Sequence, residues 1–112
     1  MALLGRPEGI SMSAYVVLIM NHVNGLEWLP EYQSKVPAIV QHHGGEYIAM
    51  SNGFKGEHIR CVDGAAPTPD AIGLLRFPSL EQAAGFFASA EYQPYRAMRV
   101  AETQGMAFAF EG

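Results

Sequence analysis

Charged side chains are scarce in this sequence. Asp, Glu, Lys and Arg together make up 16% of the 112 residues, against about 25% in an average globular chain. Apolar residues account for 49%, so a domain of this size has few polar groups with which to cover its surface. We therefore expect part of that surface to be buried against a second copy of the chain, in a homodimer.

Cysteine, excess positive charge and long apolar runs are also lacking. The single cysteine, Cys61, excludes an internal disulfide and a zinc site with several cysteine ligands. The net charge of −4 argues against a nucleic-acid partner, which would favour a basic face. No run approaches the ~18 apolar residues of a membrane span, and no apolar signal-peptide segment precedes Met12. The expected location is therefore cytoplasmic, with no membrane partner.

The first residues differ from the rest of the chain. Residues 1–12 show no hydrophobic period and contain Gly5, Pro7 and Gly9, which predicts a flexible N-terminal arm. Residues 13–112 form a single domain, in which segments of strand length alternate with segments of helical period. The predicted strands are Tyr15–Val23, Glu46–Ser51, a weaker Phe54–Val62, Ala71–Phe77 and Gly105–Phe110.

The helix boundaries are marked by capping residues, proline and glycine. A first helix follows Asn24, and Pro30 and Pro37 predict either a late start near Leu29 or a kink. Gly44–Gly45 ends this helix. Farther on, Ser79 and Gln82 stand at the spacing of a capping box. The predicted later helices are Leu80–Ala88 and, after the second capping candidate Ser89, Ala90–Thr103.

The order strand, helix, strand, strand, helix, strand predicts an α+β fold of the ferredoxin-like βαββαβ type with an antiparallel sheet. The helices of this fold cover one face of the sheet. The strand at Tyr15–Met20 is nevertheless apolar on both faces, and Met106, Phe108 and Phe110 share one face of the last strand. A second copy that stacks sheet on sheet is the simplest cover, so the predicted partner is the chain itself.

Four short motifs occur in a defined order: Lys35–Ala38, His43–Gly45 with Tyr47, Phe77–Ala83 and Ser89–Gln93. Together they resemble domain-of-unknown-function family 1330 of the dimeric α/β-barrel superfamily, over residues 13–112. The resemblance implies the fold and a dimeric α/β barrel, but no activity, since none is firmly assigned to the family. We expect no cofactor. The wider superfamily includes cofactor-free monooxygenases, lactone isomerases and haem-handling enzymes. A cavity between sheet and helices is therefore expected.

His43 is the predicted acid/base residue if the protein is an enzyme. It lies in the last turn of the first predicted helix, on its apolar side, and histidine titrates near neutral pH. A histidine at a helix end can instead bind the last helix carbonyls and favour the negative end of the helix dipole. Both interpretations stay open.

Four further side chains are candidates for ligand binding: Tyr32, Arg76, Tyr92 and Arg96. Tyr92, Arg96 and Arg99 fall at i, i+4 and i+7 on one helical face, and with Arg76 at a strand end they could surround a carboxylate or phenolate. The alternatives are ordinary surface pairing for the arginines and a core position for Tyr32.

The remaining histidines predict no chemistry. We expect His22 to be buried and hydrogen-bonded, His42 to face solvent and His58 to lie on a charged edge strand. No H-E-x-x-H or comparable spacing occurs, so no metal site is predicted.

Three functions remain open on the sequence. The first is a dimer that binds a small organic molecule between sheet and helices. The second is a cofactor-independent monooxygenase or isomerase acting on a small aromatic or lactone, with His43 as acid/base. The third is a purely structural or interaction dimer. An open space beside the first helix with His43 facing it would favour the enzyme. A space filled by large side chains such as Trp28, Tyr32 and Phe87 would not.

Overall fold

The computed structural model describes residues 13–112, so the predicted arm over residues 1–12 lies outside the described part of the chain. The elements alternate in the order strand, helix, strand, strand, helix, helix, strand. They are β1 (Ala14–His22), α1 (Leu29–His42), β2 (Glu46–Met50), β3 (Ala71–Phe77), α2 (Leu80–Ala88), α3 (Gln93–Glu102) and β4 (Thr103–Glu111).

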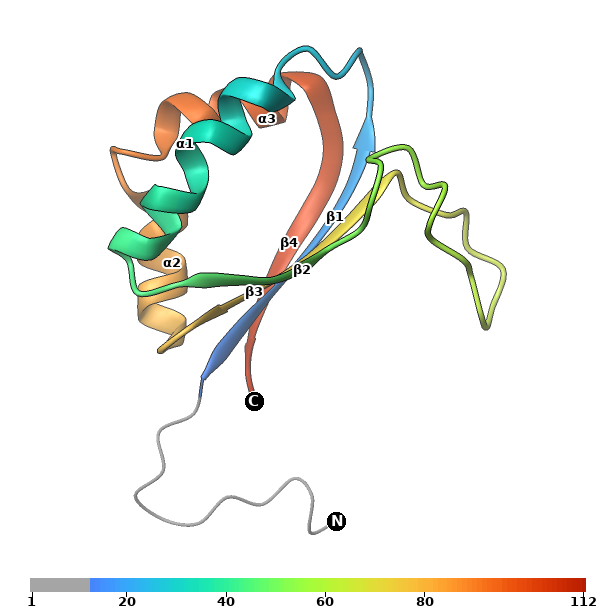
Figure 1. Cartoon of the computed structure of the whole chain (residues 1–112). Coiled ribbons are helices and arrows are strands. Elements are labelled where there is room, and N and C mark those ends of the chain that lie inside the picture. The colour runs from blue at the N-terminus through green and yellow to red at the C-terminus, as the bar shows by residue number, and fades with distance from the viewer. Residues whose placement is uncertain (1–12) are drawn as a thin grey trace, which may run out of the picture.

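One antiparallel sheet holds the strands in the order β2–β3–β1–β4. The helices α1, α2 and α3 all lie on one side of this sheet, and no described element covers the other side (Figure 1). This is the ferredoxin-like arrangement, so the predicted α+β fold is confirmed. The central strands β3 and β1 are paired along both edges and form the base on which the helices pack.

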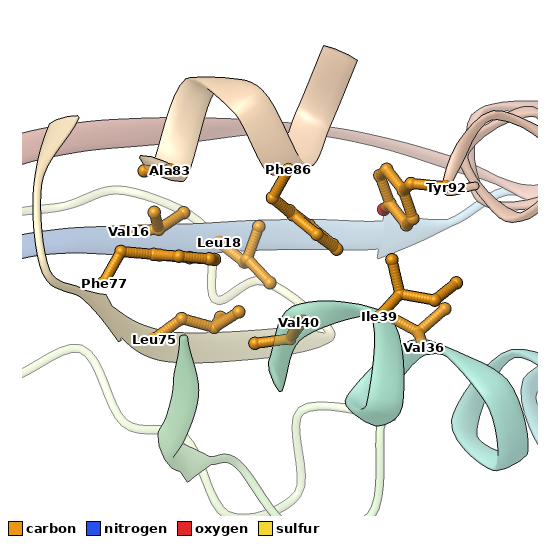
Figure 2. Packing of buried hydrophobic residues seen from close by; sticks show 10 residues of the cluster. All are labelled: Val16, Leu18, Val36, Ile39, Val40, Leu75, Phe77, Ala83, Phe86 and Tyr92. Atoms are coloured by element: carbon orange, nitrogen blue, oxygen red, sulfur yellow. The ribbon is translucent and has the colours of Figure 1, made fainter. Parts of the chain in front are cut away.

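The hydrophobic core lies between the sheet and the helices (Figure 2). Burial alternates along the first residues of β1, because every second side chain of a strand points to the same face. The buried cluster consists of Val16, Leu18, Val36, Ile39, Val40, Leu75, Phe77, Ala83, Phe86 and Tyr92. Helix α1 contributes to it mainly from its second half.

Helix α1 begins late and ends on a glycine. It starts at Leu29 with Pro30 in the first turn, where the missing N–H removes no helical hydrogen bond. The predicted late start is therefore confirmed. At the other end Gly44 adopts a φ of +78°, the left-handed region that favours glycine. The N–H groups of Gly44 and Gly45 donate to helix carbonyls at 2.9 Å, which is the Schellman arrangement.

Ser79 caps α2 as predicted. Its Oγ accepts a hydrogen bond from the backbone N–H of Gln82 at 3.1 Å. The Gln82 side chain reaches a different partner from the one a capping box predicts: Nε2 donates to the backbone carbonyl of His43 at 3.3 Å. The start of α2 is thereby linked to the end of α1.

Ser79→Ala is expected to lower the free energy of unfolding by about 1 kcal/mol, because the N–H of Gln82 loses its acceptor. Equilibrium urea unfolding measures this difference. Ser34→Ala is the matched control, since it removes a hydroxyl from inside α1 and should leave stability unchanged or slightly higher. Equal stability of Ser79→Ala and the unmodified protein would contradict a stabilising cap.

The segment between β2 and β3 departs from the prediction. Residues 54–62 form turns and irregular structure instead of a weak strand. Phe54 has a φ of +55°, and the N–H of Gly56 donates to the carbonyl of Asp70 at 2.8 Å. The loop is thereby attached beside the start of β3. The edge-strand position predicted for His58 is wrong as well, because His58 lies exposed in this loop.

The last helix is also shorter than predicted. Ala90–Thr103 was expected to be helical, but α3 begins at Gln93, after a turn. Ser89 Oγ accepts from the N–H of Tyr92 at 3.3 Å inside that turn. Thr103 already belongs to β4, where it pairs with His22 of β1. Ser89 is therefore a capping residue as predicted, but it caps the turn that precedes α3 and not the helix itself.

The sheet surface that faces away from the helices is mostly apolar, with the ion pair of Arg76 and Glu46 at one end beside Tyr15. The register places Val17 of β1 opposite Leu74 of β3 and Phe108 of β4, and paired residues share one face of a sheet. We call this surface the outer sheet face and define it by Tyr15, Val17, Ile19, Ile72, Leu74, Met106, Phe108 and Phe110. Its β4 side chains are about half exposed, and monomeric proteins rarely expose a large continuous apolar patch.

Candidate functional site

A cavity of about 220 Å³ lies between the sheet and the first half of α1. We call it the sheet–α1 cavity. Its main walls are Leu18 and Met20 of β1, Leu29 and Tyr32 of α1, and Tyr47 and Met50 of β2. An apolar cavity of about 150 Å³ is large enough for benzene, so this one has room for a substituted ring. The space beside the first helix is therefore open.

None of the described residues that line the sheet–α1 cavity carries a charge. Trp28, Gln33, Pro37 and Phe54 complete the lining. The polar groups in the walls are limited to an indole, two phenols and one amide, and the other wall atoms belong to apolar side chains. Transfer of an ion from water into such surroundings is costly, so the cavity suits an uncharged molecule.

Trp28 contributes its ring to the wall of the cavity, while its indole N–H is buried away from it. The residue is 8% exposed, and its Nε1 has no hydrogen-bond partner among the described residues. The ring of His22 lies nearby, with centroids 6.1 Å apart. Both His22 ring nitrogens are likewise buried without a partner in residues 13–112, so the predicted hydrogen bonds of this histidine are absent there.

A chain of hydrogen bonds leads from Arg99 to the cavity wall. Arg99 Nε donates to the Tyr92 hydroxyl at 3.3 Å, and the Tyr92 and Tyr32 hydroxyls lie 2.6 Å apart. Tyr92 is 1% exposed and belongs to the core, so its ring is fixed by packing. Tyr32 in turn packs edge-to-face on Trp28, with ring centroids 5.2 Å apart.

The phenols of the cavity wall stay protonated at neutral pH. Burial raises the pKa of Tyr47 to about 12, and the nearby Tyr92 adds to this. Burial also raises the pKa of Tyr32. Tyr92 also raises it, through charge and the hydrogen bond, while Arg99 opposes the shift. Both side chains are therefore hydrogen-bond donors rather than bases.

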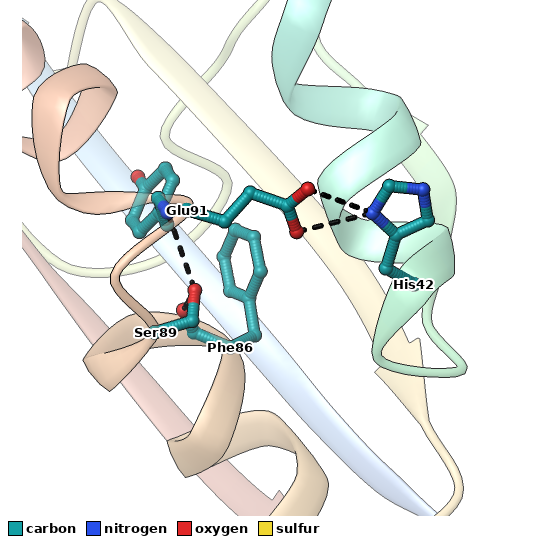
Figure 3. A network of polar contacts seen from close by, with 5 residues as sticks. His42, Phe86, Ser89 and Glu91 are labelled. Atoms are coloured by element: carbon teal, nitrogen blue, oxygen red, sulfur yellow. Dashed lines mark hydrogen bonds and ion pairs between the residues drawn. The ribbon is translucent and has the colours of Figure 1, made fainter.

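His43 is not among the described residues that line the sheet–α1 cavity. It is half-buried at the end of α1, and its ring packs edge-to-face against Phe86 with centroids 6.0 Å apart. Its neighbour His42 is exposed as predicted, and His42 Nδ1 lies 2.9 and 3.0 Å from the Glu91 carboxylate oxygens (Figure 3). These contacts connect α1 to the turn before α3, and they favour a structural role for this helix end.

The predicted ligand-binding side chains are only partly brought together. Tyr32 and Tyr92 meet through their hydroxyls. Arg76 instead forms an ion pair with Glu46 on the neighbouring strand. Arg96 lines a separate open groove of about 490 Å³ between α2, α3 and β4. Arg76 and Arg96 therefore do not converge on one anion site with the tyrosines.

Sequence reasoning did not identify Trp28, Tyr47 and Met50 as site residues. From the sequence, Trp28 was considered only as a large side chain that could fill the space beside the first helix, and the residue is indeed buried. A usable signal was its spacing of four from Tyr32, which puts both rings on one side of a helical turn. Tyr47 and Met50 come from the edge strand β2. The pairing of β2 with β3 shifts register between Tyr47 and Ala49, so the strict alternation of sides along a strand does not show that Tyr47 and Met50 both line the cavity.

Within residues 13–112, no group of three or more His, Cys, Asp and Glu side chains could hold a metal ion. No helix in that range is long and apolar enough to cross a membrane.

Residues 13–112 match the family described as Domain of unknown function (DUF1330). The chain belongs to this family. The resemblance noted in the sequence is thereby confirmed, and the function of the DUF1330 family is itself unknown. A comparison with curated proteins gives no match.

Solved structures share the fold of this DUF1330 domain. RPA0582, a protein of unknown function from Rhodopseudomonas palustris, is similar with a TM-score of 0.71 and 10% identity, covering 92% of this chain and 84% of that chain. SnoaB, a cofactor-independent oxygenase from Streptomyces nogalater, is similar with a TM-score of 0.62 and 9% identity, covering 90% of this chain and 93% of that chain. At these identities the likeness shows the fold alone.

Proposed function

We propose that this DUF1330 domain is a homodimer that binds a small, uncharged organic molecule in the sheet–α1 cavity. The observation that carries the proposal is the cavity itself, with about 220 Å³ of space and walls that are apolar and aromatic. Ligand sites in proteins are typically concave and apolar, with a few polar groups that fix orientation. The phenols of Tyr32 and Tyr47 and the amide of Gln33 are the candidates for such groups.

Met50→Trp is expected to block the cavity. Met50 is half-buried on the edge strand β2, so a larger ring can enter the cavity without displacing the central strands. We expect the affinity for ethylbenzene and for acetophenone to fall at least about tenfold, because the indole occupies the space of the ligand. Isothermal titration measures both affinities, and circular dichroism checks the fold.

Ala38→Trp is the matched control for this variant. Ala38 is exposed on α1 and is outside the described lining of the cavity, so the added indole should leave both affinities unchanged. Failure of the unmodified protein to bind either compound at millimolar concentration would contradict the proposed function. Equal binding by Met50→Trp would place the ligand elsewhere.

The homodimer rests on the outer sheet face. The helices occupy one side of the sheet (Figure 1), and the opposite side presents aromatic and branched side chains in adjacent rows. Two such faces stacked on each other would bury them at the usual distance of about 10 Å between packed sheets. The low content of charged residues, 16%, supports the same assembly.

A cofactor-independent oxygenase or isomerase is the second candidate, because SnoaB has a similar fold and is described as an oxygenase of that kind. Such an enzyme acting on a small aromatic or lactone would use the same cavity. An acid/base role for His43 requires contact with the ligand, yet His43 packs on Phe86 at the far end of α1. The cavity walls therefore support binding more directly than proton transfer.

A further inference from the structure

The open groove of about 490 Å³ between α2, α3 and β4 is separate from the sheet–α1 cavity, and no described residue lines both. We call it the β4 groove. Its floor is the helix-facing side of β4, which carries only small residues, namely Gly105, Ala107 and Ala109. Larger side chains at these positions would fill the space, so the groove follows directly from the alternation of small and large residues along this strand.

The walls of the β4 groove are apolar and open to solvent. Nine large hydrophobic side chains are exposed among residues 13–112, and four of them line this groove. They are Leu80, Val100, Met106 and Phe108, which are 37% to 60% exposed. Exposed apolar surface that gathers in one concave place is typical of a binding site. The groove therefore offers contact to an apolar group.

Two arginines supply the charge of the β4 groove. Arg96 and Arg99 are three positions apart on α3, a spacing that places side chains beside each other on a helix. Their guanidinium groups are the only polar side-chain groups in the described lining, which contains no Asp or Glu. Neither arginine forms an ion pair with a carboxylate within residues 13–112. The surface pairing that the sequence left open for them is therefore absent there.

Arg99 is held in place by the core. It is half-buried, and its Nε donates at 3.3 Å to the hydroxyl of Tyr92, a residue that is 1% exposed. This contact uses one N–H of the guanidinium and leaves the two terminal nitrogens for another acceptor. Paired N–H groups of this kind match the two oxygens of a carboxylate.

We propose that the β4 groove binds an amphipathic anion, with a carboxylate at Arg96 and Arg99 and a short aliphatic chain along the floor of β4. Both parts of the ligand are needed. An ion pair near solvent contributes little by itself, and burial of the chain against the exposed apolar walls adds the rest of the affinity. The site is independent of the sheet–α1 cavity, whose described lining carries no charge.

Three probes separate the two parts: octanoate has the chain and the charge, octanol has only the chain, and acetate has only the charge. Methionine methyl signals in ¹³C NMR report on each site, because Met106 lines the β4 groove while Met20 and Met50 line the sheet–α1 cavity. Octanoate should shift the Met106 signal with an affinity at least about tenfold higher than octanol or acetate. Added salt should weaken octanoate binding and leave octanol binding unchanged.

Substitutions test the charge and the floor separately. Arg96→Gln should weaken octanoate binding at Met106 about fivefold and octanol binding by less than about twofold. Arg60→Gln is its matched control, since Arg60 is exposed in the loop before β3 and outside the groove. Ala107→Leu should weaken both compounds at least about fivefold, because its side chain occupies the floor. Ala97→Leu, on the exposed surface of α3 outside the groove, should weaken neither.

Equal affinities of octanol and octanoate at Met106, or an Arg96→Gln variant that binds octanoate as the unmodified protein does, would overturn the proposed anion site. Octanoate that shifts Met20 and Met50 instead of Met106 would overturn it as well. Conversion of a dimer to a monomer by Ala107→Leu in sedimentation would show that a second copy covers the groove, which also overturns it. Binding of acetophenone and ethylbenzene in the sheet–α1 cavity is a separate measurement, so the proposed function can stand when this site fails.

Discussion

Phe108→Glu is expected to separate the proposed homodimer into folded monomers. Phe108 lies in the middle row of the outer sheet face, opposite Val17, and is 60% exposed in the single chain. A carboxylate is therefore tolerated in the monomer. In a symmetric dimer it appears twice in an apolar interface, where a buried charge is costly. We expect the dissociation constant to rise about 1,000-fold or more, which corresponds to about 4 kcal/mol.

Sedimentation at micromolar concentration measures this change. The unmodified protein should sediment at twice the chain mass of 12.2 kDa and the variant at the chain mass. Val62→Glu is the matched control, because Val62 is 88% exposed in the loop before β3 and lies outside the outer sheet face. Sedimentation of the unmodified protein as a monomer would contradict the homodimer. A dimeric Phe108→Glu would place the interface on another surface.

The elements with strong local signals were predicted correctly from the sequence. Ala71–Phe77 and Leu80–Ala88 agree with the structure residue for residue, because an apolar run, a proline and a capping serine are all local features. The same holds for the end of α1 at Gly44. The order of the elements then leaves few possible topologies, and the ferredoxin-like sheet follows from that order.

Segments whose conformation depends on distant partners were predicted less well. The expected strand at Phe54–Val62 has apolar residues, but within residues 13–112 it pairs with no strand, although β2 lies at the edge of the sheet. Instead it is attached through the Gly56 to Asp70 hydrogen bond, 14 positions away in the chain by those residue numbers. No local pattern indicates such a contact. Gln82 shows the same limit, since its side chain contacts the Ser79 hydroxyl and also donates to the distant carbonyl of His43, which no local pattern predicts.

The candidate site shows why a helical face alone does not identify a cavity. Tyr32 and His43 both lie on the inner side of α1, but the first half of the helix covers the cavity and the second half packs in the core. The sequence predicts which side of α1 faces the sheet, but it does not predict which half of the helix lines the cavity. The contact between Tyr32 and Tyr92 joins residues 60 positions apart, so their shared hydrogen bond became visible only in the fold.

Phe86→Ala is expected to give the largest loss of stability among the core substitutions considered, about 3–5 kcal/mol in the free energy of unfolding. Phe86 is 2% exposed. Its ring stacks on Tyr92 with centroids 4.3 Å apart and contacts Phe77 and Phe87 with centroids 5.7 and 4.9 Å apart. Removal of the ring leaves a void at the point where α2, β3 and the turn before α3 meet, and close packing prevents neighbours from filling it.

Urea unfolding of Phe86→Ala tests the value, and Phe87→Ala is the matched control. Phe87 is only partly buried and lines the open groove beside β4, so its truncation should cost about half as much. Because Phe86 holds the Tyr92 ring, its loss should also loosen the Tyr92–Tyr32 hydrogen bond and weaken acetophenone binding, whereas Phe87→Ala should leave that binding intact. Equal losses of stability in the two variants would show that the aromatic cluster is not centred on Phe86. Unchanged acetophenone binding in Phe86→Ala would show that Tyr32 is positioned without Tyr92.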